Sequence, residues 1–147
     1  MKPPTPPRVA HAGFIALALL AVACSSSSQG GGALPGEQVV RVKVDDFAIK
    51  APKRVPSGNV VLRVRNGGPD MHELILVHAQ GGELPLRRDN LTVDEAAIEP
   101  RTVSLLEDAQ PDTVRDWKLK LEPGRYVLLC NMSGHYLGGM HTELVVR

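Results

Sequence analysis

Apolar and polar residues alternate along two early segments of the chain. Between residues 40 and 44, valine alternates with arginine and lysine, and between residues 60 and 65 every second side chain is Val or Leu. A period of two is typical of half-buried strands. Residues 56–59 (Pro-Ser-Gly-Asn) supply a turn before the second segment. Further strand candidates are residues 71–79, 102–106, 117–121, 125–130 and 142–147. Seven or so short strands separated by Gly, Pro, Asn and Asp predict an all-β sandwich.

One segment departs from this pattern. Thr92 and Glu95 have the spacing of a capping box, in which the Thr92 side chain accepts from the amide of Glu95 and Glu95 reaches back. Ala96, Ala97 and Ile98 follow before a proline, so we expect one or two helical turns. We interpret the polar, proline-marked stretch from residue 81 to 117 as a plain crossover between sheets, with no second domain in it.

The amino terminus has the pattern of an export signal. Lys2 and Arg8 precede an uncharged run of small and apolar residues from 12 to 23. Twelve residues are too few to cross a bilayer, which takes about 20 in helical form. A positive start followed by a short apolar run is typical of a secretory signal peptide. The sequence therefore predicts that the protein works outside the cytoplasm, in a periplasm or at a cell surface.

The end of this run is more specific. Leu20-Ala21-Val22-Ala23-Cys24 resembles the lipobox of bacterial lipoproteins, whose cysteine is lipidated and becomes the first residue of the mature protein. Ala21 departs from the leucine most often found there. The resemblance implies a lipid anchor at Cys24. The alternative is an ordinary signal peptide cut at the same small residues, with Cys24 as an incidental thiol.

These features divide the chain into three parts. Residues 1–23 are the expected signal peptide, residues 24–36 a Ser/Gly-rich flexible tether, and residues 37–147 the folded domain. The full chain has a net charge of +1, and loss of Lys2 and Arg8 leaves 15 basic against 16 acidic residues. A balance so close to neutral does not support a nucleic-acid-binding function.

The cysteine count raises a question about Cys130. The chain has two cysteines, and a lipidated Cys24 cannot form a disulfide with the other. Outside the cytoplasm, disulfide formation is the usual fate of cysteine. An unpaired Cys130 therefore needs another explanation.

The segment from residue 130 to 140 offers one. It places Cys130, His135 and Met140 at the spacing C-x4-H-x4-M between two predicted strands. Sulfur ligands together with imidazole favour copper and suit both Cu(I) and Cu(II). His72 follows the Gly/Pro loop 66–70 and opens an apolar strand, so it can supply a further imidazole. Taken singly, each of these residues is more often a core or strand-end side chain.

With these residues in view, the domain resembles the cupredoxins, the plastocyanin- and azurin-like blue copper proteins, with a loop spacing similar to that of rusticyanin and auracyanin. The resemblance implies a Greek-key β-sandwich that binds one copper ion. It implies His72, Cys130 and His135 as equatorial ligands and Met140 as the weak axial ligand. It further implies that His135 reaches the surface within a patch of small or apolar residues, namely Ser133, Gly134, Tyr136, Leu137, Gly138 and Gly139.

Glu73 departs from the family pattern. Many cupredoxins have Asn or Ser after the first ligand histidine, where it ties that loop to the residue after the cysteine, here Asn131. A carboxylate at this position can accept a hydrogen bond from the side chain or the main chain of Asn131. Its negative charge near the metal would favour Cu(II) and lower the reduction potential.

The functional expectation is single-electron transfer without catalysis, by a monomer that meets transient redox partners at the membrane and has no small-molecule substrate. A multicopper enzyme would need further histidine clusters, a binuclear copper centre would need a second cysteine in the loop, and methionine is not a usual zinc ligand. The alternative is a protein that sequesters copper or delivers it to a membrane enzyme with the same four residues.

Overall fold

The computed structural model describes Met1 and residues 36–147. Cys24 lies outside the described residues, as do the predicted signal peptide and tether except for Met1 and Gly36, so the expectations for these segments stay predictions. Within the described part of the chain, no helix has the length and apolar character needed to span a membrane.

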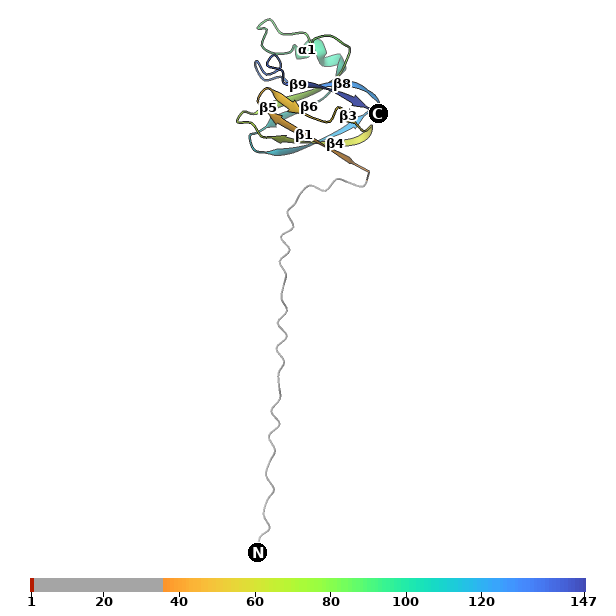
Figure 1. Ribbon diagram of the computed structural model, residues 1–147, viewed down its shortest axis with the longest axis vertical. Coiled ribbons are helices and arrows are strands. Elements are labelled where there is room, and N and C mark those ends of the chain that lie inside the picture. Colours follow the sequence, from red (N-terminus) through yellow and green to blue (C-terminus); the bar gives the residue numbers. More distant parts are fainter. Residues whose placement is uncertain (2–35) are drawn as a thin grey trace. The chain divides into compact units, whose positions relative to one another are not determined.

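The folded domain consists of two β-sheets (Figure 1). The four-stranded sheet has the order β2-β1-β4-β7 and is formed by β1 (Gln38–Asp45), β2 (Ala48–Lys50), β4 (Gly58–Asn66) and β7 (Val114–Leu121). The five-stranded sheet has the order β3-β9-β8-β5-β6 and is formed by β3 (Arg54–Val55), β5 (His72–His78), β6 (Thr102–Ala109), β8 (Gly124–Cys130) and β9 (His141–Val146). The predicted all-β sandwich is confirmed.

The inward-facing residues of both sheets form the main core. On β1, Val40, Val42 and Val44 are buried and the residues between them are exposed, as the period of two predicts. Leu62 on β4 and Leu128 on β8 are fully buried in the same cluster. The sequence pattern found the seven longer strands and missed β2 and β3. These have three and two residues, too few to show a period.

The segment between β5 and β6 differs from our expectation. The stretch from residue 81 to 117 does pass between the sheets, but only near its end, from β6 of the five-stranded sheet to β7 of the four-stranded sheet. β5 and β6 are antiparallel neighbours in one sheet, so the segment that joins these two strands is not a crossover between sheets. Its Leu84, Val93 and Ile98 instead form a second apolar cluster with Ile75 and Leu129 of the five-stranded sheet. The segment therefore covers a sheet face that would otherwise be exposed, and β5 is buried on both faces.

The predicted helical turn is present as α1 (Glu95–Ile98), followed by the 3-10 turn η1 (Glu99–Arg101). Its predicted cap is wrong. Asp94 is the N-cap, and its side chain accepts from the amide of Ala97. The Thr92 hydroxyl is buried without a hydrogen-bond partner among the described residues, and the Glu95 carboxylate is bound by Asn131. A tertiary contact has thus replaced the local capping box.

Candidate metal centre

Strand pairing brings His72 and Cys130 to the same end of the sandwich. His72 is the first residue of β5 and Cys130 is the last residue of β8. These strands are antiparallel, and Leu74 lies opposite Cys130. His72 and Cys130 are 58 positions apart in the sequence, and this strand pairing brings them together.

The loop from residue 131 to 140 adds the other two predicted residues. Met140 donates its amide to the carbonyl of His135 at 2.9 Å, and Cys130 donates its amide to the carbonyl of Met140 at 2.9 Å. The loop thereby folds back on the end of β8. Met140 is completely buried and belongs to the same apolar cluster as Cys130.

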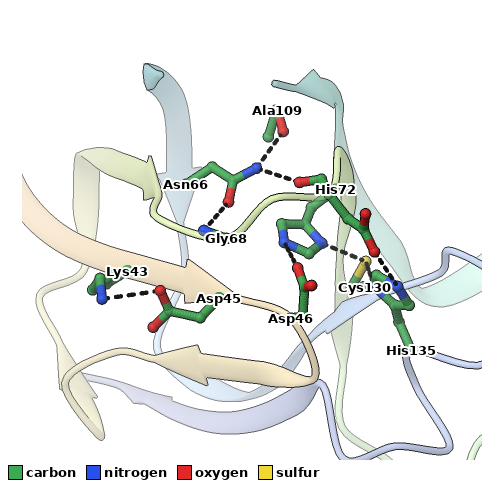
Figure 2. Close-up of polar contacts among 10 residues, drawn as sticks. Lys43, Asp45, Asp46, Asn66, Gly68, His72, Ala109, Cys130 and His135 are labelled. Atoms are coloured by element: carbon green, nitrogen blue, oxygen red, sulfur yellow. Dashed lines mark hydrogen bonds and ion pairs between the residues drawn. The ribbon is translucent and has the colours of Figure 1, made fainter. Parts of the chain in front are cut away.

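Three donor atoms converge in this loop and strand end. The Cys130 Sγ atom lies 3.8 Å from His72 Nδ1 and 3.6 Å from His135 Nδ1 (Figure 2). One ligand atom from each of the three residues lies within 4.8 Å of the others, and all three residues are buried. Among the described residues this is the single group of His, Cys, Asp and Glu with such geometry.

These distances fit one metal ion. A Zn²⁺ ion, close in size to Cu²⁺, lies about 2.0–2.1 Å from imidazole nitrogen and about 2.3 Å from thiolate sulfur. At bond angles of roughly 110–120° the sulfur and nitrogen are then roughly 3.6–3.8 Å apart. Both sulfur–nitrogen distances around Cys130 fall in this range. The donor set of one thiolate, two imidazoles and a buried thioether suits copper.

A pair of facing polar atoms supports the same conclusion. His72 Nε2 and Asp46 Oδ1 are both buried without a hydrogen-bond partner among the described residues, and they lie 3.5 Å apart (Figure 2). A metal ion on Nδ1 requires the proton of the neutral ring to sit on Nε2, where it faces the carboxylate. Metal-bound histidines are commonly oriented by such a carboxylate. The sequence analysis had not singled out Asp46.

The thiol of Cys130 needs a cation to ionise. Burial raises the pKa of the Cys130 thiol, although backbone hydrogen bonds from Met132 and Glu73 act in the opposite direction. A bound metal ion supplies the positive charge that holds the thiolate.

The imidazole of His72 is prepared to act as a ligand. Burial lowers the pKa of His72, and the neighbouring His135 lowers it further, against the charge of Asp46. The ring is therefore neutral at neutral pH, which is the form that binds a metal.

Asn66 holds the loop that carries His72, and the sequence analysis missed this role. Its Nδ2 atom donates to the carbonyls of Asp70 at 2.7 Å and Ala109 at 2.9 Å, and its Oδ1 atom accepts from the amide of Gly68 (Figure 2). The side chain is buried, so these bonds satisfy its polar atoms fully. The sequence signal was an asparagine that opens the Gly/Pro loop.

Asn131 holds the other ligand loop, in a different way from the one expected. Its Oδ1 atom accepts from the amide of Val93 at 2.7 Å, and its Nδ2 atom donates to the carbonyl of Val93 and to the Glu95 carboxylate at 2.7 Å. Glu73 is joined to Asn131 only through its main-chain carbonyl, which accepts from the Asn131 amide. The prediction of a hydrogen bond to the Glu73 carboxylate is wrong. The polar atoms of the Asn131 side chain bond Val93 and Glu95 of the segment between β5 and β6 instead.

His135 is less accessible than the resemblance implied. It is 7% exposed, because the ring of Phe47 packs against it at a centroid distance of 5.0 Å. Tyr136, expected in an apolar surface patch, instead accepts from the amide of Leu84 and faces His141. Leu137 is exposed as expected.

The other histidines among the described residues, His78 and His141, lie outside this group. His78 is at the far end of β5, exposed, with its ring against Tyr126. His141 is exposed and pairs with Tyr136. Met71 and Met132 are partly buried, and Met132 packs against the main core.

Comparison with known proteins identifies the fold. No protein-family model and no curated protein matches the sequence. Auracyanin A, a "blue" copper protein from Chloroflexus aurantiacus, matches at 21% identity and a TM-score of 0.55, covering 76% of this chain and all of its own. Auracyanin from Roseiflexus castenholzii matches at 17% identity and 0.54, covering 75% of this chain and 97% of its own.

Rusticyanin from Thiobacillus ferrooxidans matches at 15% identity and a TM-score of 0.55, covering 75% of this chain and 78% of its own. At these identities the likeness concerns the fold. The chain thus has the cupredoxin fold of auracyanin and rusticyanin, with a His-Cys-His-Met cluster at one end of its sandwich like that of a blue copper site.

Proposed function

We propose that this protein binds one copper ion through His72, Cys130, His135 and Met140 and transfers single electrons. The observation that carries the proposal is the spacing of the Cys130 sulfur from the two Nδ1 atoms, 3.8 and 3.6 Å, which suits one ion. His72, Cys130 and His135 would supply the three strong donors, and the buried Met140 thioether would supply a weaker one. When bound, copper supplies a one-electron redox couple.

The residues around the donors hold them in one arrangement. His72 and Cys130 are fixed by paired strands. Asn66 fixes the loop that precedes His72, and Asn131 fixes the loop that follows Cys130. A scaffold that does not rearrange between oxidation states makes electron transfer fast. No other group of His, Cys, Asp and Glu side chains among the described residues could hold a second metal, which favours a carrier over a multicopper enzyme.

Copper sequestration or delivery is the second candidate function. The same four residues would serve it, and soft sulfur ligands bind Cu(I) well. Delivery requires that the ion leave readily. The buried ligands and the hydrogen-bonded loops oppose this, so we favour electron transfer.

The visible spectrum tests the proposal. When Cu(II) is added to the purified chain, we expect an intense absorption band at about 600 nm, caused by charge transfer between the Cys130 thiolate and the metal. Addition of a reductant should remove the band, and reoxidation should restore it over repeated cycles. A colourless protein that binds only Cu(I) tightly would contradict electron transfer and favour delivery.

We further propose that the protein works outside the cytoplasm, anchored to a membrane by lipid on Cys24, and exchanges electrons with transient partners there. The lipobox-like residues 20–24 support this proposal. In the native host, Cys24→Ala should move the protein from the membrane fraction to the soluble exported fraction, measured by immunoblot. A Ser25→Ala variant should stay with the membrane, and equal membrane association of both variants would rule out the anchor.

A further inference from the structure

Phe47 has a backbone conformation that its side chain disfavours. It lies in the two-residue turn between β1 and β2 with φ of +59°. The other non-glycine residues with positive φ in the described part of the chain are Asn90, Asp108 and Asp112, whose short polar side chains tolerate that region. A bulky aromatic residue there is strained, and such strain persists only where surrounding contacts hold it.

Burial of Phe47 in the core does not explain the strain. The residue is 51% exposed. What the ring does contact is the imidazole of His135, at a centroid distance of 5.0 Å and an interplanar angle of 53°. Tilted pairs at this separation are favourable. His135 is only 7% exposed although it lies on a loop, and the Phe47 ring is one of the groups that cover it, together with His72 and Asp70.

Gly138 shows that the ligand loop is shaped to admit this ring. A Cβ atom at position 138 would overlap Phe47 Cδ1, so the ring or the loop would have to move. Gly138 does not have a positive φ, so its own backbone does not require glycine. The space that a side chain would fill is taken by Phe47.

We propose that Phe47 is a positioning residue for His135, holding the imidazole in its ligating orientation and keeping water from the metal at this edge. The inference extends the proposed copper function. A partner that docks here meets the Phe47 ring before the imidazole. A drier site disfavours the more highly charged oxidised state, so the Phe47 ring raises the reduction potential.

The first test uses metal-free protein and does not depend on copper. An aromatic ring shifts the proton resonances of a group stacked on it, so the His135 ring protons should report on Phe47 in a proton–carbon NMR spectrum. Phe47→Gly removes the ring and relieves the strained φ, so this variant should fold. We expect the His135 resonances to move strongly and those of His78 to stay.

Three further variants make this test specific. Phe47→Tyr should restore the native His135 shifts. Gly138→Ala should displace the ring and reproduce the change seen in Phe47→Gly, and the double variant should add nothing. Val114→Ala, which trims a similarly exposed apolar residue on β7, should leave the His135 resonances in place. Unchanged His135 resonances in Phe47→Gly would overturn the proposal.

The second test uses the copper-loaded chain. Loss of a favourable ring pair and entry of water should speed copper release to a chelator by about threefold to tenfold in Phe47→Gly. The reduction potential should fall in the same variant, and Phe47→Tyr should restore both values. Release rates and potential equal to those of the unaltered protein would contradict the positioning role. If the unaltered chain binds no copper, the copper proposal fails, and the NMR test still decides whether Phe47 positions His135.

Discussion

Cys130→Ser abolishes the visible band of the copper-loaded protein: this is the largest effect that we expect. The band requires a thiolate bonded to Cu(II), and a serine hydroxyl neither ionises at neutral pH nor supplies a soft sulfur donor. Of the three strong donors, only the imidazoles of His72 and His135 would then remain. The absorption spectrum at equal protein and copper concentrations measures the loss.

The control for this variant is a second sulfur residue in the same loop. Met132 lies two positions from Cys130 and packs against the core, but we do not assign it to the metal. Met132→Leu should keep the full band. Circular dichroism should show that the Cys130→Ser chain remains folded. A band that survives in Cys130→Ser would show that the ligand assignment is wrong.

Asn131→Ala should cost the metal-free protein about 2–4 kcal/mol of unfolding free energy, because it leaves buried polar groups without partners. The Asn131 side chain satisfies both the amide and the carbonyl of Val93, and Val93 is fully buried. It also binds the Glu95 carboxylate at 2.7 Å. Urea unfolding followed by Trp117 fluorescence measures the loss.

A matched asparagine on the surface provides the comparison. Asn59 is exposed on β4, and Asn59→Ala should change the unfolding free energy by less than about 0.5 kcal/mol. The Asn131→Ala protein should also bind copper less tightly, since the loop that carries Cys130 and His135 loses its attachment to the segment between β5 and β6. Equal stability of the two variants would show that the Asn131 contacts contribute nothing.

Local patterns were enough for the seven longer strands and for the choice of candidate metal ligands. The alternation on β1 and β4 depends on the pleat alone, and the spacing of Cys130, His135 and Met140 lies within a single loop. His72 lies far from Cys130 in the sequence, but its position directly after a Gly/Pro loop marked it as a candidate ligand. Each of these signals lies within a few residues of the position that it predicts.

The two wrong hydrogen-bond predictions concern contacts between distant segments. Thr92 and Glu95 matched a capping box, but Asn131 takes the Glu95 carboxylate and Asp94 caps the helix instead. The Glu73 carboxylate was expected to accept from the side chain or the main chain of Asn131, but the side chain bonds Val93 and Glu95, and the amide donates to the Glu73 carbonyl. A local motif predicts a hydrogen bond only when no distant group makes a better one.

The sequence by itself determined that the domain is a sandwich of short strands and which thiol, imidazole and thioether side chains are candidate ligands of one metal ion. Only the tertiary structure decided how that site is enclosed. Asp46 faces His72, and the ring of Phe47 lies over His135 in the space left by Gly138. The physical reason is that ligands are identified by their chemistry, whereas enclosure depends on which distant side chains the packing of two sheets brings together.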